Sequence, residues 1–152
     1  MKIEEEIKSS NPIDLSKQVM LNLHFTRNTI SDKFNEVLRP YAISVEQFNV
    51  LRILRGQKDN TVNMNVIQER MMTKNSNTTR LIDKLLIKNM VTRNICKDNR
   101  RKMEIKITPI GLKALEELDA KVIAHDNSFT ENLNKAELNQ LNDLLEKLRT
   151  IK

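Results

Sequence analysis

A cluster of basic side chains near residue 100 carries the clearest chemistry in the sequence. Four cations lie within six positions, at Lys97, Arg100, Arg101 and Lys102, with Asp98 among them. Such cations repel one another and add nothing to an apolar core, so they indicate binding to phosphates or to a narrow minor groove. Asp98 could orient an arginine guanidinium rather than bind DNA itself. A merely solvated, charged turn is the alternative.

A second segment with binding chemistry runs from residue 74 to residue 80 and is dense in small polar side chains. It consists of Lys74, Asn75, Ser76, Asn77, Thr78, Thr79 and Arg80. Short polar side chains at a helix start allow close approach to base edges and phosphates, and the helix amides attract phosphate oxygens. The same residue types also favour an ordinary solvated helix start, which is the alternative.

The distribution of charge favours a polyanionic partner. The chain of 152 residues has a net charge of +6. Residues 52–106 contain 14 Lys and Arg against 5 Asp and Glu, a net charge of +9, whereas the remaining residues carry −3. Because neutralising phosphates releases condensed counterions, such clustering supplies affinity for nucleic acid. We therefore expect double-stranded DNA as a partner, with a solvated basic surface as the alternative.

Other chemistries have little support in the residue types present. No Ser/His/Asp set, phosphate loop or carboxylate pair at a defined spacing occurs, so we expect neither an enzyme nor a cofactor. The one cysteine, Cys96, excludes an intramolecular disulfide and a zinc site built on several thiolates, and we expect no metal. Cys96 is interpreted as an inert strand residue, with a redox switch as the weaker hypothesis.

The sequence also bears on location. No apolar run approaches the roughly 18 residues that a membrane span needs, so we expect no contact with a membrane. The first six residues, Met-Lys-Ile-Glu-Glu-Glu, are neither a signal peptide nor a transit peptide. These features predict a cytoplasmic protein.

Helices must position these segments, because only two glycines and three prolines occur and helix-forming residues are plentiful. Residues 1–10 lack an apolar face and are expected to be frayed. Capping residues and apolar side chains at helical spacing predict helices near residues 12–38, 44–55, 63–71, 75–89, 109–127 and 134–151. The period then changes to two in residues 91–96 and 103–107, which predicts a two-stranded hairpin with the basic cluster at its tip.

Individual residues mark several of these boundaries. Asn11 followed by proline is expected to start the first long helix, and Ser44 with Gln47 reads as a capping box. Asn63 or Asn65 could cap the third helix. Asn89 is expected to take the left-handed conformation after a helix. Methionines in and around this region are interpreted as filling gaps in a core. They are Met64, Met71, Met72 and Met90.

Three short helices followed at once by a hairpin form a winged helix-turn-helix in sequence order. In that motif the third helix enters the major groove of DNA and the hairpin flanks it. The third helix here, near residues 75–89, begins with the polar segment, and the hairpin carries the basic cluster. The fold class is therefore expected to be mainly α with a small β-hairpin.

These residues resemble the bacterial MarR-type regulators over about residues 12–150. The most specific part is Asp98-Asn99-Arg100-Arg101 followed by Ile107-Thr108-Pro109-Ile110-Gly111, which is similar to the family's wing signature of Asp-x-Arg and then Leu-Thr-x-x-Gly. Residues 78–85 are similar to the family's recognition helix. Asn89 stands where the family usually has glycine, and Ile107 stands where leucine is usual, and both departures are physically mild.

The resemblance implies roles for individual residues. Arg100 would enter the minor groove with Asp98 supporting it, and residues 75–80 would meet the major groove. Family members are homodimers with interdigitated terminal helices, which implies dimerisation helices at 11–40 and 109–152 around a DNA-binding lobe at 41–108. A twofold dimer would require a roughly palindromic operator. A single monomeric core is the alternative.

The resulting functional hypothesis is a sequence-specific regulator, more specifically a repressor, whose dimer is moved between DNA-competent and incompetent states by a small ligand. His24, beside Phe25, is a candidate for lining the ligand cavity that family members form between the dimer helices and the lobe, with a structural role as the alternative. The competing function is a winged-helix module for protein contact or scaffolding, with its basic face toward an acidic protein.

Overall fold

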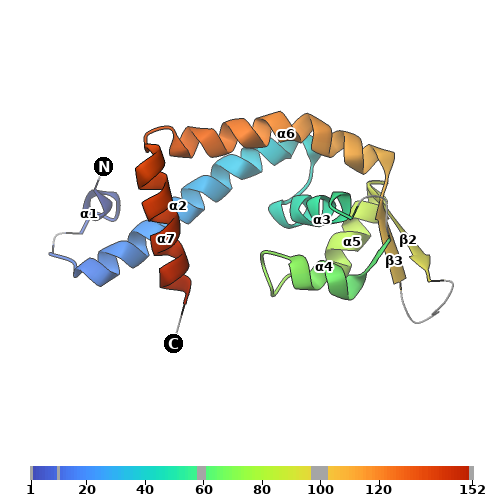
Figure 1. Ribbon diagram of the computed structural model, residues 1–152, viewed down its shortest axis with the longest axis horizontal. Coiled ribbons are helices and arrows are strands. Elements are labelled where there is room, and N and C mark those ends of the chain that lie inside the picture. Colours follow the sequence, from blue (N-terminus) through green and yellow to red (C-terminus); the bar gives the residue numbers. More distant parts are fainter. Residues whose placement is uncertain (1, 10, 58–60, 97–102, 151–152) are drawn as a thin grey trace.

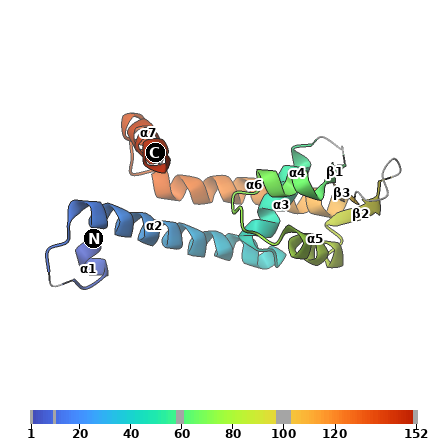
Figure 2. The same cartoon turned by 90° about the horizontal axis from the view of Figure 1, so that it is seen from below.

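The protein consists of a compact lobe at one end of a pair of long helices. A computed structural model describes residues 2–9, 11–57, 61–96 and 103–150. Helices α2 (Leu15–Leu38) and α6 (Pro109–Thr130) run antiparallel and side by side in both views (Figure 1, Figure 2). Helix α7 (Lys135–Arg149) follows α6 at the end away from the lobe, where both chain termini lie.

The lobe has the element order of a winged helix-turn-helix, as the sequence predicted. Its elements are η1 (Arg39–Tyr41), α3 (Val45–Arg55), β1 (Val62–Asn63), α4 (Met64–Arg70), α5 (Thr78–Ile87), β2 (Val91–Ile95) and β3 (Met103–Ile107). The strands form an antiparallel sheet in the order β1-β3-β2. Strand β1 was not predicted, because two residues are too few to show a period of two. It adds to the far edge of β3, with Val62 opposite Ile105.

A single apolar core fills the lobe and continues toward α6. Its fully buried side chains come from every lobe helix, from β3, from the end of α2 and from α6. They are Leu38, Val50, Leu51, Ile67, Ile82, Leu85, Ile105, Leu115 and Leu118. The first half of α6 therefore belongs to the same packed unit as the lobe helices and strands, because burying this surface is the main force that holds them together.

Two expectations for the N-terminal part need correction. Helix α2 begins at Leu15 rather than Pro12, because Asp14, not Asn11, supplies the cap, and its Oδ2 accepts from the Ser16 amide at 3.0 Å. The segment expected to be frayed contains a short helix, α1 (Ile3–Glu6), whose Ile3 is buried. The Glu5 carboxylate accepts from the Lys2 amide at 3.1 Å and closes its first turn.

The other boundary signals are confirmed. Ser44 and Gln47 form a reciprocal capping box at 3.2 and 3.0 Å at the start of α3. Asn63, rather than Asn65, caps α4 by accepting from the Val66 amide at 3.0 Å. Asn89 has a φ of 54°, the left-handed conformation expected after α5.

The interpretation of the methionines holds for three of the four. Met71 and Met90 are buried and Met64 packs half-buried against the core, whereas Met72 is 87% exposed. The reason is local. Met71 ends α4 with an extended backbone, φ −60° and ψ 136°, and consecutive side chains in extended chain point to opposite sides. With Met71 inside, Met72 must point outward.

The hairpin, the end of α5 and the start of α6 meet at one crowded junction. The Thr108 amide donates to the Met90 carbonyl at 3.0 Å, and the Thr108 hydroxyl donates to the Asn89 carbonyl at 2.7 Å. The same hydroxyl accepts from the Gly111 amide at 3.2 Å, as the N-cap of α6. A Cβ on Gly111 would lie 2.4 Å from the Met90 carbonyl oxygen and 2.8 Å from Ile107. Glycine is required here by close backbone approach.

Gly111→Ala is expected to destabilise the protein by about 1–3 kcal/mol, because backbone at the junction must move to admit the methyl group. Urea unfolding followed by circular dichroism measures the change. Gly56→Ala is the matched control: Gly56 has a φ of −65°, and an added Cβ would meet only ordinary contacts at 3.5 Å. The control should be neutral or more stable by up to about 1 kcal/mol. Equal stability of both variants would contradict the close approach.

Candidate nucleic-acid interface

The helix-turn-helix consists of α4, a turn over residues 71–77 and α5. Asn77 caps α5 by accepting from the Arg80 amide at 3.0 Å, so the helix begins at Thr78. The Ser76 hydroxyl donates to the Thr73 carbonyl at 2.7 Å within the turn. Helix α5, the predicted recognition helix, is therefore shorter than the expected range of 75–89. The helix begins three residues later than expected, because Asn75 and Ser76 belong to the connection between α4 and α5 and do not cap α5.

Gln68 of α4 clamps the start of α5, a role that the sequence did not reveal. Its Nε2 donates to the Lys74 carbonyl at 2.6 Å, and its Oε1 accepts from the Thr78 hydroxyl. The Lys74 ammonium donates to the Glu69 carbonyl at 2.6 Å. A glutamine in a short polar helix gives no signal of this kind, because its partners are six and ten residues away and meet it only after the turn has formed.

The structure separates the predicted contact residues of this segment into an exposed set and an internal set. Lys74, Asn75, Asn77, Thr79 and Arg80 are exposed. Ser76 is half-buried. Thr78 is 4% exposed and its hydroxyl donates to Gln68, so Thr78 holds the start of α5 in place and is not on the surface. Lys84, also exposed, continues the outer face of α5 one turn beyond Arg80.

The hairpin that flanks α5 is described as far as Ile95 on one strand and from Met103 on the other. Its register places Val91 opposite Ile107, Arg93 opposite Ile105 and Ile95 opposite Met103. The predicted wing residues Asp98, Arg100, Arg101 and Lys102 lie outside the described residues, and their roles stay predictions.

An ion pair links the hairpin to α5. Arg93 Nη1 of β2 lies 2.6 Å from Asp83 Oδ1 of α5, and the two side chains are 31% and 49% exposed. Asp83 lies on the same side of α5 as Thr79 and Arg80, because residues three and four positions apart share a helix face. This pair was not predicted from the sequence. Opposite charges ten residues apart became a signal only once α5 and β2 were known to pack together.

A second ion pair fastens the lobe to α6. Both Arg55 amino groups donate to the Asp119 carboxylate, each at 2.9 Å. This hydrogen bonding, together with the positive charges of Arg55 and Arg52, lowers the pKa of Asp119 below its ordinary value of 3.8, against a smaller opposing effect of burial. The pair joins the last turn of α3 to the middle of α6.

A cavity of about 240 Å³ lies where α2, α3 and α6 meet beside the lobe. It is lined by Ile30, Ser31, Phe34, Val45, Phe48, Asn49, Arg52, Met72, Val122, His125 and Asp126. The rings of Phe34 and Phe48 stand edge to face at 5.3 Å, and the Arg52 guanidinium lies 5.9 Å from the Phe48 ring. The cavity thus combines aromatic walls with one arginine and one aspartate.

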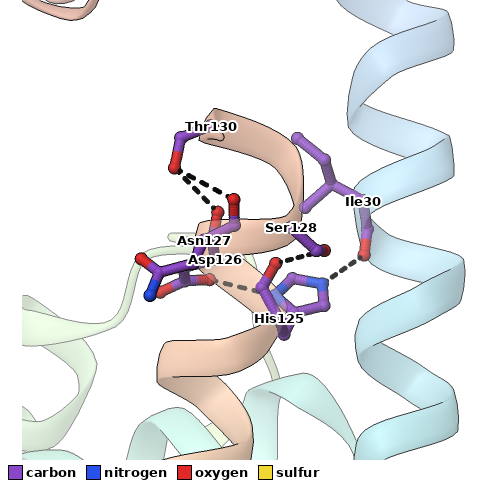
Figure 3. Close-up of polar contacts among 6 residues, drawn as sticks. All are labelled: Ile30, His125, Asp126, Asn127, Ser128 and Thr130. Atoms are coloured by element: carbon purple, nitrogen blue, oxygen red, sulfur yellow. Dashed lines mark hydrogen bonds and ion pairs between the residues drawn. The ribbon is translucent and has the colours of Figure 1, made fainter. Parts of the chain in front are cut away.

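The histidine at this junction is His125, which the sequence analysis did not single out. His125 is buried, and its ring joins α6 to α2: Nδ1 lies 2.9 Å from Asp126 Oδ1 and Nε2 lies 3.2 Å from the Ile30 carbonyl (Figure 3). It packs against Phe34 and Phe129 at 5.0 and 5.2 Å. The predicted lining residue, His24, is exposed on α2 and does not line this cavity.

Across residues 2–9, 11–57, 61–96 and 103–150, no group of three or more His, Cys, Asp or Glu side chains could hold a metal ion. Within those same ranges, no helix is long and apolar enough to cross a membrane.

Most of the lobe matches a known protein family. Residues 43–103 match the model of the MarR family, a span that runs from just before α3 to the first residue of β3. The resemblance to the MarR family is confirmed. No curated protein sequence gives a significant match.

Solved structures of MarR proteins share this fold over nearly the whole chain. A MarR transcription factor from Planctomyces limnophilus is 29% identical, with 90% of this chain and 98% of that one covered and a TM-score of 0.69. BpsR from Bordetella bronchiseptica, whose DNA binding is regulated by 6-hydroxynicotinic acid, is 22% identical over 93% and 100% of the chains, with a TM-score of 0.79.

A third structure holds DNA. It is a cysteine-to-serine variant of MarR from E. coli in complex with operator DNA, 24% identical over 90% of this chain and 99% of that one, with a TM-score of 0.76. The winged helix-turn-helix of this chain is thus the MarR fold, and the comparisons support a role in transcriptional regulation.

Proposed function

We propose that this protein is a sequence-specific DNA-binding regulator of transcription that acts in the cytoplasm as a homodimer, and that it is a repressor. The observation that carries the proposal is the outer face of α5. This face belongs to a winged helix-turn-helix in the basic part of the chain. Its exposed residues are Asn77, Thr79, Arg80 and Lys84. We propose no catalytic activity.

Each part of this face has a partner on DNA. Arg80 can donate two hydrogen bonds to a guanine edge, and Thr79 and Asn77 are short enough to let α5 approach the groove. Lys74, Asn75 and Lys84 lie where phosphates would flank the helix. Arg100 enters the adjacent minor groove in this proposal, with Asp98 supporting it and with Arg101 and Lys102 on phosphates.

The distal helices supply the dimer interface. No side chain of α7 is buried, although its leucines form one stripe. A groove of about 630 Å³ between α7 and α2 is lined by Val19, Asn22, Leu23, Thr26, Ile30, Leu141, Leu144, Leu145 and Leu148. So much exposed apolar surface on an amphipathic helix indicates that another protein surface covers it.

We propose that a second copy of this chain is the occupant. The stripe continues onto α2, where Leu15 and Val19 are exposed, so both helices of a partner can interdigitate with it. The parts outside residues 52–106 carry a net charge of −3, so they would not themselves attract DNA. A twofold dimer presents two α5 helices and requires a pseudo-palindromic site.

The cavity beside His125 is the proposed effector site. It lies between α2 and α6, which lead to the dimer interface, and α3, which belongs to the lobe. A ligand that prefers one arrangement of these helices would shift the spacing of the two α5 helices. In BpsR, DNA binding is regulated by 6-hydroxynicotinic acid. A ring acid of this kind could stack on Phe34 and Phe48 and direct its carboxylate to Arg52.

Operator binding tests the function directly. Fluorescence anisotropy with the protein's own upstream intergenic duplex and a scrambled duplex, at several salt concentrations, should show at least tenfold preference for the former and a steep loss of affinity with salt. Arg80→Ala and Arg100→Ala should each weaken specific binding about tenfold or more. Lys135→Ala, a cation at the start of α7, is the control and should leave the affinity within about twofold.

Equally weak binding of both duplexes, with no effect of either arginine variant, would contradict the proposal. A genome-wide selection for bound DNA would then establish whether an operator exists elsewhere. If none is found, the competing function as a winged-helix module for protein contact or scaffolding takes its place.

The dimer is tested by placing a charge in the apolar stripe. Light scattering after size exclusion should give twice the chain mass of 17.8 kDa for the wild type. Leu144→Glu should give the mass of one chain, because a buried carboxylate without a partner is strongly unfavourable. Asn139→Glu adds the same charge on the opposite side of α7 and should stay dimeric. A monomeric wild type, or a dimeric Leu144→Glu, would contradict this interface.

The effector cavity is tested with a tryptophan reporter, because the chain contains no tryptophan. Phe34→Trp places the ring at the cavity wall, and Phe25→Trp places it on the exposed part of α2 as the control. Titration with 6-hydroxynicotinic acid should change the emission saturably in the first variant alone and should weaken operator binding by the wild type. No saturable change in Phe34→Trp would contradict regulation by this ring acid through this cavity.

A further inference from the structure

We infer that the Asp83–Arg93 ion pair is a positioning device that holds the hairpin at a set angle to the recognition helix, so that both can contact one DNA duplex. This inference rests on the proposed DNA-binding function. It concerns residues that precede the basic cluster and that belong to neither of the two segments in which base or phosphate contacts are proposed.

The pair lies where apolar packing of the hairpin ends. Val91, Arg93 and Ile95 point to the same face of the sheet, because alternate residues of a strand share a face. Along this row Val91 is buried, Arg93 is half-buried and Ile95 is 59% exposed. The opposite residue of Ile95, Met103, is also exposed. Beyond the Arg93–Ile105 pair the hairpin therefore has little apolar contact to fix its direction.

Arg93 replaces that contact with a directional one. Its Nη1 lies 2.6 Å from Asp83 Oδ1, a short charge-assisted hydrogen bond. Arg93 is opposite Ile105, which is fully buried, so the stem of the arginine starts from the part of the sheet that the core holds rigidly. Asp83 is equally well anchored, because its neighbour Ile82 is fully buried. The hydrogen bond thus joins two firm points on separate elements.

The position of Asp83 argues for such a role. It lies on the outer face of α5 beside Thr79, Arg80 and Lys84, where a carboxylate repels the phosphates that those residues attract. A half-exposed ion pair contributes little to folding stability. Asp83 thus weakens the attraction of α5 for phosphates and adds little to folding stability. Its presence is explained if it holds Arg93, and through Arg93 the hairpin.

The geometry matters because two elements must reach one duplex at once. A two-stranded hairpin is marginally stable by itself, and β1 pairs with β3 only at Ile105 and Glu104, so the strand ends nearer the tip have no third strand beside them. If the hairpin is already in the bound direction, binding does not have to order it, and the affinity is higher for the same contacts.

Asp83→Asn separates positioning from plain electrostatics, because the two predict opposite signs. Loss of a negative charge beside DNA should by itself tighten binding, whereas loss of positioning should weaken it. We expect operator affinity to fall about tenfold, with a shallower salt dependence because fewer phosphates are contacted. Asp83→Glu keeps the charge and should stay within about threefold of the wild type. Thermal unfolding of each variant shows whether the fold is intact.

The matched control is Asp119→Asn. It breaks the Arg55–Asp119 pair, which has nearly the same exposure, 32% and 49%, and removes the same charge away from the hairpin. Operator affinity should then change by less than about twofold. Coupling is measured by the Asp83→Asn/Arg93→Gln double variant, which should bind no more weakly than the weaker single variant, because both substitutions remove one interaction.

Unchanged or tighter operator binding by Asp83→Asn overturns the inference. If that variant does not fold, Arg93→Lys carries the test, because it keeps the charge and loses the guanidinium geometry. Binding weakened threefold or more supports positioning, and unchanged binding overturns it. Wild-type protein that binds no duplex contradicts the proposed function itself, which distinguishes the two failures.

Discussion

The close approach of α6 to the Met90 carbonyl is the constraint on which the arrangement of this molecule depends. Asn89 turns the chain out of α5 in the left-handed conformation, Thr108 bonds to the carbonyls of Asn89 and Met90, and Gly111 leaves room for the contact. The end of α5, the base of the hairpin and the start of α6 therefore meet at one point. The start of α6 and the end of α5 are thus joined by direct contacts at this junction.

The chain has one part whose apolar side chains are buried in a core and another part whose apolar side chains stay exposed. The lobe and the adjoining half of α6 bury a continuous core, and Arg55 with Asp119 fastens α3 to α6 on the surface. The distal part of α2 and the whole of α7 keep their apolar stripes exposed. The cavity with His125 lies between these two parts, at the place where a small change in helix packing would alter both.

Much of the fold follows from local chemistry and could be predicted. The capping residues Ser44, Thr108 and Asn134 start helices because their side chains satisfy amides within three residues, which depends on no distant contact. The change of apolar period predicted β2 and β3. Prediction failed where local signals competed, as between Asn75, Ser76 and Asn77, or where an element was too short to show a period, as in β1.

The candidate site divides in the same way. The sequence by itself determined which polar and basic side chains are concentrated around the recognition helix, and that the helices at either end have apolar stripes, because charge and periodicity are properties of the chain alone. Only the tertiary structure decided that Thr78 is internal, that Gln68 clamps the turn, that Asp83 meets Arg93 and that His125 rather than His24 lies at the helix junction. Each of these depends on residues from separate elements, whose distance is set by packing and not by spacing along the chain.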